Sequence, residues 1–423
     1  MGKIVDIQTA VGIIQSHQNV FVQGGAATPI ALLHALSERA SELKNVQIIS
    51  MSMLGDIKIS SPEYTDSFYF NSLFVSPPIR KNVNGLNGDY IPVFLSEIHQ
   101  LFERGKLPLD VSLIHVSPPD KHGFCSLGMS VDVARSAVKY AKTVIAQVNP
   151  KMPRTHGDGV VSAKNIDYFV EAEQDLPLVD YRSKIGDSER KIANHVATLI
   201  EDGATLQLGI GTIPDAVLQK LTNHKDLGVH TEMFSNGVVE LMKSGVINNK
   251  FKHKHRFKTA TAFAIGDQEL YDFVDDNPEF VFLNASYVND GYVIRSNPKV
   301  VAVNSAIEID LTGQICADSI GTYQYSGVGG QMDFIRGAAL SEGGKPIIAM
   351  SAVSGKGISK ITPTLNNGAG VVTTRAHAHY VVTENGIADL FGKNLKQRAE
   401  ALRDIAAPAH QEMLDQAIFE RFK

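Results

Sequence analysis

The sequence predicts an α/β protein built from two similar open α/β domains, and three observations favour this fold class. The chain has 423 residues, which is long for one core, because single hydrophobic cores stop growing near about 250–300 residues. Short and almost wholly apolar runs alternate with helical patterns, as expected of parallel strands that helices cover on both faces. A strand, a Gly-rich turn and a helix near the start recur in the second half, which indicates an internal duplication.

The duplicated segment is a βα unit, present at residues 20–36 and again at 205–221. Five identities keep one constant offset, the first of which pairs Gly24 with Gly209. In each copy an apolar strand leads into a glycine turn, and a proline stands near the first turn of an amphipathic helix. A duplicated α/β domain is the simplest explanation of these matches.

An Asp-x-x-Gly motif is the second repeated feature, beginning at Asp120 and again at Asp310, with an offset close to that of the βα unit. A helical pattern over residues 188–203, with Ser188 as a possible cap and Gly203 as the stop, opens the second half. We therefore place the boundary near residue 185 and predict domains at residues 1–185 and 186–423.

Further elements follow from the apolar runs. The predicted strands cover residues 46–51, 111–116, 143–148, 280–285, 300–306, 346–353, 370–374 and 380–384. The C-terminal segment, residues 394–423, predicts a helix packed on the body of the protein.

The composition narrows the function classes. With 43% hydrophobic and 20% charged residues, it is that of an ordinary globular protein. The net charge of −5, from 40 basic and 45 acidic residues, argues against a general nucleic-acid surface, although a local basic patch for an anionic ligand remains possible.

The sequence also indicates a cytoplasmic protein with no membrane span. Only two cysteines occur, Cys125 and Cys316, so no disulfide framework is implied and a reducing compartment is expected. No window approaches about 18 unbroken apolar residues, and the N-terminal segment lacks the pattern of a secretion signal.

The most informative segment for chemistry lies between residues 206 and 237. It reads as a buried strand, the Gly209-Ile-Gly211 turn, a helix, and a second strand end that carries Glu232. A glycine turn that opens a helix can hold a phosphate or a pantetheine chain against main-chain N–H groups. A carboxylate nearby is a ready nucleophile for a thioester, since it is already ionised at neutral pH. The pairing favours acyl or CoA chemistry, although a single glutamate at a strand end more often has a structural role.

Other chemistries have less support. Neither Gly209-x-Gly211 nor the loop Gly327-Val-Gly329-Gly330 matches the dinucleotide fingerprint, and no Walker A pattern or G-x-S-x-G elbow occurs. Either glycine turn could direct N–H groups at a thioester oxyanion.

Two basic or His-rich segments leave alternatives open. Residues 250–258, KFKHKHRFK, could meet the phosphates of CoA, although a strand with one solvated cationic face is the simpler interpretation. The pairs His253/His255 and His377/His379 have the spacing of metal ligands on a strand. No acid or Cys partners cluster at ligand spacing, so we expect no metal site.

Seven segments together resemble the acetyl-CoA hydrolase/transferase family, and they run in order along nearly the whole chain. They are SPPDKHGFCSLGMSVD (117–132), QVNPKMPRTHGDG (147–159), LGIGTIPDAV (208–217), GVHTEMFSNG (228–237), VNSAIEIDLTGQ (303–314), YSGVGGQMDFIRGA (325–338) and ENGIADLFGKNLKQRA (384–399). The resemblance implies two similar open α/β domains with the active site between them.

The resemblance also implies the roles of particular residues. The family's catalytic glutamate corresponds to Glu232, in the segment His230-Thr231-Glu232-Met233. The implied oxyanion or supporting residues are Asn304, Gly329 and Gly330, and the implied CoA contacts are Gly209, Ile210, Gly211, Thr212, Ile213, Gly327, Gly329 and Gly330.

The implied enzyme is a CoA-transferase that works by a ping-pong mechanism through a glutamyl-CoA thioester. Its substrates would be acyl-CoA and short-chain carboxylates, with 4-hydroxybutyrate, butyrate and acetate as candidates. Coenzyme A would be a substrate and covalent intermediate rather than a permanently bound cofactor, and a homo-oligomer is expected. An acyl-CoA hydrolase and a non-catalytic acyl-CoA-binding protein are the alternatives.

The sequence departs from the family pattern at two places. The loop after the glutamate reads SNG where SDG is common, and the segment IAAPAHQEML has Ala407, Ala409 and Gln411 where His, Asp and Arg are usual. Both departures leave Glu232 unchanged and bear on loop geometry and C-terminal packing.

Overall fold

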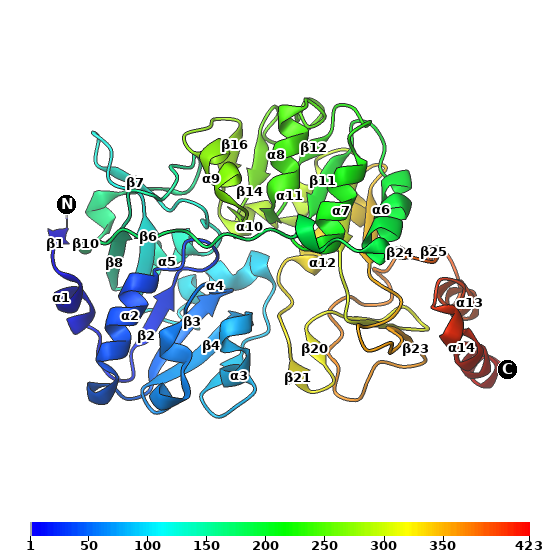
Figure 1. Cartoon of the computed structure of the whole chain (residues 1–423), viewed down its shortest axis with the longest axis horizontal. Helices are drawn as coiled ribbons and strands as arrows, with labels where there is room; N and C mark the ends of the chain where they lie inside the picture. The colour runs from blue at the N-terminus through cyan, green and yellow to red at the C-terminus, as the bar shows by residue number, and fades with distance from the viewer. Residues whose placement is uncertain (1) are drawn as a thin grey trace. The chain divides into compact units, whose positions relative to one another are not determined.

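The computed structural model describes residues 2–423, and the chain divides into two compact units (Figure 1). Unit 1 contains the described residues up to Val179, together with Ala260–Val288 and Gln324–Gly329. Unit 2 contains Asp180–Thr259, Asn289–Tyr323 and Gly330–Lys423. The division of the sequence at residue 185 and a site between two domains stay predictions.

Unit 1 is built on an eight-stranded sheet in the order β1-β10-β8-β6-β2-β3-β4-β5, and every neighbouring pair is parallel. The strands are β1 Lys3–Ile4, β2 Asn19–Val22, β3 Val46–Met51, β4 Phe68–Phe74, β5 Gly88–Tyr90, β6 Val111–Val116, β8 Thr143–Val148 and β10 Tyr168–Glu171. The principal helices are α1 Ile7–Gly12, α2 Ile30–Glu38, α3 Arg80–Val83, α4 Ile98–Glu103, α5 Ala134–Tyr140, α9 Gln268–Val274 and α10 Ala285–Val288. Short strands β7 Phe124–Ser126 and β9 Val160–Ser162 pair antiparallel.

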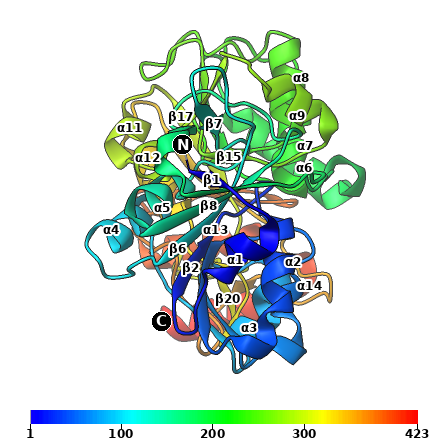
Figure 2. The ribbon, with the colours of Figure 1, turned by 90° about the vertical axis from the view of Figure 1, so that its left-hand side faces the viewer.

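Helices cover both faces of this sheet, which explains why its central strands β2, β3, β6 and β8 are buried at almost every position. Figure 2 shows α1 and α2 on one side of β2, with α4 and α5 on the other. Along β2, Val20 and Val22 belong to the core that includes α1 and α2. Phe21, which points to the opposite face, makes an edge-to-face contact with Phe102 of α4, with ring centroids 6.0 Å apart. A strand with two covered faces has no solvent-facing positions, so its sequence does not alternate.

Unit 2 is built on a six-stranded sheet in the order β12-β11-β17-β22-β24-β25. All pairs are parallel except β24 with β25, which form an antiparallel pair. The strands are β11 Thr205–Leu208, β12 Gly228–Val229, β17 Val300–Asn304, β22 Lys345–Ala349, β24 Tyr380–Thr383 and β25 Gly386–Asp389. The helices are α6 Asp187–Leu199, α7 Thr212–Lys220, α8 Asn236–Lys243, α11 Gly291–Arg295, α12 Gln331–Leu340, α13 Leu395–Asp404 and α14 Pro408–Arg421.

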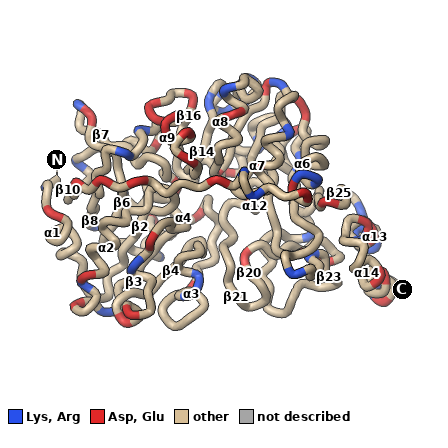
Figure 3. Tube along the Cα trace, in the orientation of Figure 1, with Lys and Arg blue, Asp and Glu red and all other residues tan. Residues whose placement is uncertain are grey.

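The other short strands lie in connecting segments. They are β13 Met233–Phe234, β14 Thr259–Thr261, β15 Phe263–Ala264, β16 Phe280–Phe282, β18 Glu308–Asp310, β19 Ile315–Cys316, β20 Ser319–Ile320, β21 Tyr323–Gln324 and β23 Ile361–Thr362. Lys and Arg residues are interspersed with Asp and Glu along both units (Figure 3). Within residues 2–423, no helix has the length and apolarity that crossing a membrane requires.

The predicted α/β class and the two open sheets are confirmed. The order β10-β8-β6-β2-β3 in unit 1 matches the order β24-β22-β17-β11-β12 in unit 2, so the two units share a five-strand arrangement. The glycine turn joins β2 to α2 in the first unit and β11 to α7 in the second. The duplicated βα unit therefore occupies the same place in both sheets.

The Asp-x-x-Gly repeats also form the same local structure. In both, the aspartate Oδ1 accepts from the main-chain N–H groups two and four residues later, at 2.8–3.0 Å. The glycines, Gly123 and Gly313, donate to the carbonyl oxygens of Asp120 and Asp310 at 2.9 Å. Their φ angles of +80° and +94° explain the glycine.

Several sequence expectations need correction. Residues 370–374 form no strand beyond an isolated bridge at Thr373. The C-terminal region forms two helices (α13 and α14) where one was expected, and residues 250–258 are turns and bends. The basic run was expected to place its cations on a solvated strand face. Instead, Lys252 is only 2% exposed, because this loop wraps around the edge of a sheet.

The two repeated glycines make a matched test of packing. A Cβ at Gly24 would lie 1.8 Å from the Met51 carbonyl oxygen, whereas a Cβ at Gly209 would meet nothing within 4 Å. We expect Gly24→Ala to lower the free energy of unfolding by about 1–3 kcal/mol through overpacking. Gly209→Ala should change it by no more than about 0.5 kcal/mol. Thermal unfolding of the two variants measures this, and equal shifts in Tm would contradict the packing argument.

Candidate active site

Glu232 follows the edge strand of the unit 2 sheet. The strand β12 pairs with β11, and the chain then runs through His230 and Thr231 to Glu232. The His230 N–H donates to the Leu206 carbonyl at 3.0 Å, and the Thr231 hydroxyl donates to the Leu208 carbonyl at 3.0 Å. These bonds fix the glutamate at the carboxyl end of parallel strands, where sites in open α/β sheets lie.

The carboxylate of Glu232 lies against the start of helix α12. A Cβ built on Gly330, the N-cap residue of α12, would be 1.9 Å from Glu232 Oε2. Only glycine permits this approach, because any side chain at position 330 would displace the carboxylate. The N-terminal end of a helix carries partial positive charge, which favours a carboxylate there.

Asn289 connects this carboxylate to a second one. Its Nδ2 lies 3.2 Å from Glu232 Oε2 and 3.2 Å from Asp333 Oδ2, in the first turn of α12. Asn289 is 1% exposed, and among the described residues its Oδ1 has no hydrogen-bond partner. A ligand N–H or O–H is therefore a chemically suitable partner for this oxygen. The sequence carries no signal of this contact, since Asn289 stands far from Glu232 along the chain.

Asn304, which was expected to hold the glutamate or the thioester carbonyl, has a different partner. It ends strand β17, and its Nδ2 donates to Gln207 Oε1 on the adjacent strand β11 at 2.9 Å. This bond links the carboxyl ends of two neighbouring strands. The role of Asn304 toward Glu232 or a substrate stays a prediction.

The glycine turn of unit 2 is open. A Cβ at Gly209 would meet nothing within 4 Å, and at Gly211 it would meet only a Pro214 ring atom at 4.0 Å. Gly211 has a φ of +125° and serves as the N-cap of α7. Gly209 through Ile213 are partly exposed, so their main-chain groups are accessible to a ligand.

The corresponding turn of unit 1 is closed by the chain itself. Gly24 is buried against the Met51 carbonyl oxygen. The N–H of Ile30, the first residue of α2, lies 3.0 Å from Gln174 Oε1, and Gln174 also donates to the Thr28 carbonyl at 3.2 Å. The amide side chain of Gln174 thus occupies the place that a ligand would need at this helix N-terminus.

The predicted loop 327–330 divides between the two units. A Cβ at Gly327 would lie 2.9 Å from the Phe74 ring, and the Leu95 N–H donates to the Gly329 carbonyl at 3.0 Å, both within unit 1. Gly330 belongs to unit 2 and contacts Glu232. Of the predicted glycines in this loop, the structure places Gly330 beside the glutamate.

Two family models match the chain. The acetyl-CoA hydrolase/transferase N-terminal domain matches residues 1–180, and the acetyl-CoA hydrolase/transferase C-terminal domain matches residues 266–418. The chain belongs to the acetyl-CoA hydrolase/transferase family. The predicted family is therefore confirmed.

Several known proteins are similar to this chain over nearly its whole length. The succinyl-CoA:acetate/propanoyl-CoA:succinate CoA transferase of Fasciola hepatica is 50% identical over 417 residues, 97% of this chain and 87% of the relative. The 4-hydroxybutyrate coenzyme A transferase of Clostridium kluyveri is 47% identical over 422 residues, 99% of this chain and 98% of the relative. The crystal structure of RipA from Yersinia pestis, 32% identical, superposes with a TM-score of 0.93 and covers 99% of this chain and 97% of that one. The predicted enzyme class, CoA-transferase, is supported at this level of similarity.

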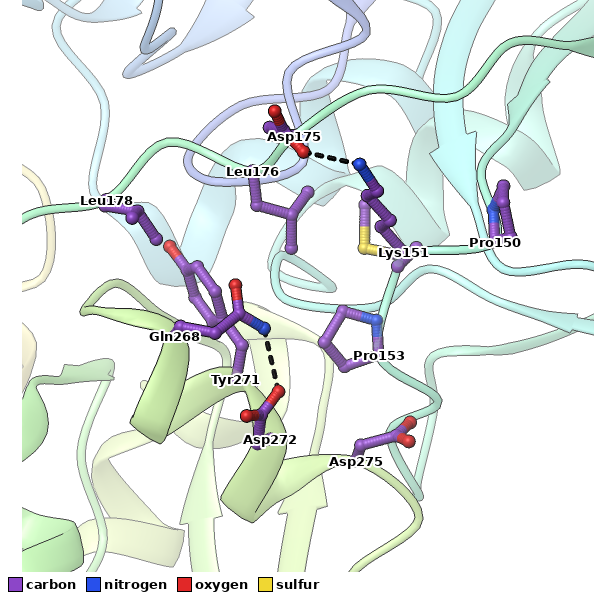
Figure 4. A pocket seen from close by; sticks show the side chains of 11 residues that line it. Pro150, Lys151, Pro153, Asp175, Leu176, Leu178, Gln268, Tyr271, Asp272 and Asp275 are labelled. Atoms are coloured by element: carbon purple, nitrogen blue, oxygen red, sulfur yellow. Dashed lines mark hydrogen bonds and ion pairs between the residues drawn. The ribbon is translucent and has the colours of Figure 1, made fainter.

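A separate cavity of about 600 Å³ lies within unit 1 of this acetyl-CoA hydrolase/transferase chain (Figure 4). Its lining residues are Pro150, Lys151, Met152, Pro153, Asp175, Leu176, Leu178, Gln268, Tyr271, Asp272 and Asp275. Two pairs of its polar groups bond each other, namely Lys151 Nζ with Asp175 Oδ1 at 2.7 Å and Gln268 Nε2 with Asp272 Oδ1 at 2.7 Å. None of the predicted site residues lines it. In the described part of the chain no group of three or more His, Cys, Asp or Glu residues could hold a metal ion.

A buried hydrogen bond anchors the segment after the glutamate to helix α7. The Ser235 hydroxyl, three residues after Glu232, donates to Asp215 Oδ1. Asp215 is 2% exposed, and burial raises its pKa to about 6, although the Ser235 hydrogen bond opposes the shift. At neutral pH this carboxylate is therefore ionised at a cost to the folded state.

Replacing Asp215 by Asn should remove a pH dependence of stability. The folded pKa of about 6 lies above the ordinary value of 3.8, so the stabilisation from the bound proton is full below about pH 4 and is lost as the pH rises through 6. We expect the free energy of unfolding of Asp215→Asn, relative to that of the parent, to rise by about 2–3 kcal/mol between pH 4 and pH 7. Unfolding at both pH values measures the difference. A constant difference would show that Asp215 is not protonated in this range.

Proposed function

We propose that this chain is a CoA-transferase that moves CoA between a short-chain acyl-CoA and a carboxylic acid, with Glu232 as the nucleophile. The observation that carries the proposal is the position of Glu232. Its Oε2 accepts a hydrogen bond from the Asn289 amide and lies against Gly330 at the helix N-terminus. A hydrogen bond that fixes one oxygen orients the whole carboxylate, and an oriented, ionised carboxylate is suited to attack a thioester. The family membership supports the same reaction class.

The proposed first half-reaction has two steps. A Glu232 oxygen attacks the thioester carbonyl carbon, the carbon–sulfur bond breaks, and an acyl-glutamyl anhydride and CoA thiolate result. The thiolate then attacks the glutamyl carbonyl of the anhydride, which gives a glutamyl-CoA thioester and releases the carboxylate of the donor. No proton or electron is consumed, because each bond made to the glutamyl or acyl carbon replaces another.

In the second half-reaction the acceptor carboxylate runs these steps in reverse. It attacks the carbonyl carbon of the glutamyl thioester, which releases CoA thiolate and gives an acyl-glutamyl anhydride. The thiolate then attacks the acyl carbonyl of the anhydride, which forms the new acyl-CoA and frees Glu232. A developing oxyanion needs donors already in place, and the main chain at Gly330, bordering the glutamate carboxylate, is the candidate among the predicted residues. Gly329 and Asn304 keep their predicted supporting roles.

The open turn over Gly209–Ile213 is the proposed contact for CoA in unit 2. This turn is open, whereas the equivalent turn in unit 1 is filled by Gln174. The difference supports the assignment of CoA binding to unit 2. Gly327, Gly329 and Gly330 complete the predicted CoA contacts. Binding of the CoA tail would supply free energy that can be used at the thioester.

Short-chain acids such as 4-hydroxybutyrate, butyrate and acetate are the proposed substrates, and CoA is the proposed substrate and covalent intermediate without a permanent cofactor. A cytoplasmic location and a homo-oligomeric state also stay predictions. The second candidate is an acyl-CoA hydrolase, in which water resolves the acyl-enzyme or CoA-enzyme, and the family description covers both activities. A non-catalytic acyl-CoA-binding protein is the third.

Peptide mass spectrometry with butyryl-CoA distinguishes these candidates. A CoA adduct on the peptide containing Glu232, discharged by acetate with formation of acetyl-CoA, is the expected result. Glu232→Gln should lose the adduct and more than about a thousandfold in turnover. The matched control is Glu240→Gln, on the exposed side of α8. Release of CoA without dependence on acetate would favour the hydrolase, and no adduct and no turnover would favour the binding protein.

Asn289→Ala tests whether the Asn289 amide orients the Glu232 carboxylate. Without the amide donor, Glu232 and Asp333 lose a shared partner, and misorientation of the nucleophile should lower kcat by about 10–100-fold while KM changes little. Asn277→Ala, which removes an amide that bonds the Phe273 carbonyl of unit 1, is the control. Unchanged kcat in a folded Asn289→Ala chain would contradict the assigned role.

A further inference from the structure

The strand that leads to Glu232, β12, lies at the edge of the unit 2 sheet, so its outward main-chain polar groups have no neighbouring strand to bond. In β12 the inner main-chain groups bond β11, since the N–H groups of Gly228 and His230 donate to the Ala204 and Leu206 carbonyls. In a parallel pair the intervening residue directs its N–H and C=O to the other side. That residue is Val229, which is 1% exposed, so its outward groups need partners other than water.

Two side chains from the following loop supply these partners. The Val229 N–H donates to Asn249 Oδ1 at 2.8 Å, and the Val229 carbonyl accepts from Lys252 Nζ at 2.6 Å. Asn249 has a φ of +58°, a conformation that Asn tolerates better than most residues. Its Nδ2 donates to the Thr259 hydroxyl at 3.1 Å, which fixes the amide orientation.

Lys252 is an unusual residue for this purpose. It is 2% exposed, and its second partner is the Lys258 carbonyl at 2.6 Å. Within residues 2–423 no carboxylate pairs with it, and burial lowers its pKa to about 7. Burying an ammonium group without an opposite charge costs more than burying an apolar side chain of the same length. A Met here would avoid that cost but could not donate a hydrogen bond. We therefore attribute the lysine to its two hydrogen bonds, since packing alone does not require it.

The neighbouring strand residue makes room for the lysine. A Cβ at Gly228 would lie 2.7 Å from Lys252 Cγ and 2.9 Å from Cδ. The absence of a side chain at position 228 thus allows the lysine stem to lie along the strand and bring Nζ to the next carbonyl. Gly228, Asn249 and Lys252 form one structure, which we call the β12 clamp.

We propose that the β12 clamp positions the nucleophile, and that Lys252 and Asn249 are positioning residues for Glu232. Glu232 stands only three residues beyond Val229, a span of at most about 11 Å of extended chain. Within that span the chain has little length in which to absorb a shift of Val229. The inference rests on the proposed function of Glu232 and extends it to residues that touch no substrate.

The test compares Lys252→Met with Lys356→Met. The first keeps the length of the buried stem and removes the donor. The second removes the charge of an exposed lysine of unit 2 that lies outside the basic run 250–258. We expect Lys252→Met to lower kcat and the rate of adduct formation on Glu232 by about 10–100-fold, with KM for acyl-CoA within about twofold, because a misplaced nucleophile weakens the reacting state and not CoA binding. Lys356→Met should match the parent in all three.

A second variant makes the test independent of the lysine. Asn249→Gly keeps the left-handed backbone accessible and removes the acceptor for the Val229 N–H, and it should reduce kcat in the same direction without raising KM. If wild-type protein forms no CoA adduct, the proposed function fails and the clamp with it. If wild type forms the adduct and both folded variants equal it in rate, only the positioning role is overturned. Failure of both variants to fold would overturn it too, in favour of a purely structural role.

Discussion

The carboxylate of Glu232 can lie against the first turn of α12 only because residue 330 has no side chain. An added Cβ would be 1.9 Å from Oε2 and 2.2 Å from the Asn289 amide nitrogen, so one missing methyl group allows glutamate, asparagine and helix N-terminus to meet. The rest of unit 2 supports this contact. Parallel strands bring the glutamate to their carboxyl edge, and the β12 clamp and the Ser235–Asp215 bond hold the chain on either side of it.

The fold was largely predictable because its information is local. Strands such as residues 46–51 and 111–116 begin and end as expected, since a strand covered on both faces forms a mostly apolar run. The glycine turns and Asp-x-x-Gly motifs were predictable for a similar reason, as each is a short hydrogen-bonded pattern within a few residues. Residues 370–374 are an exception: an apolar run predicts burial, but it does not specify a pairing partner.

The site was predictable only in part. Glu232 and Gly330 stand in motifs that the sequence displays, whereas Asn289 becomes a neighbour of the glutamate only through the packing of a distant segment. Lys252 shows the same limit more sharply, because a basic run normally indicates a solvated surface. Its burial depends on Gly228, which belongs to an earlier strand, and no local pattern expresses that dependence.

The closed turn of unit 1 has a consequence for how the duplicated halves differ. Gln174 presents a carboxamide oxygen to the N–H of Ile30, so the first copy carries a built-in substitute for whatever a helix N-terminus would otherwise attract. Because Gln174 belongs to the chain itself, this contact does not depend on the concentration of any solute. In the second copy, residues 209–213 stay partly exposed. The two copies thus keep one backbone plan and differ in whether solvent can reach the turn.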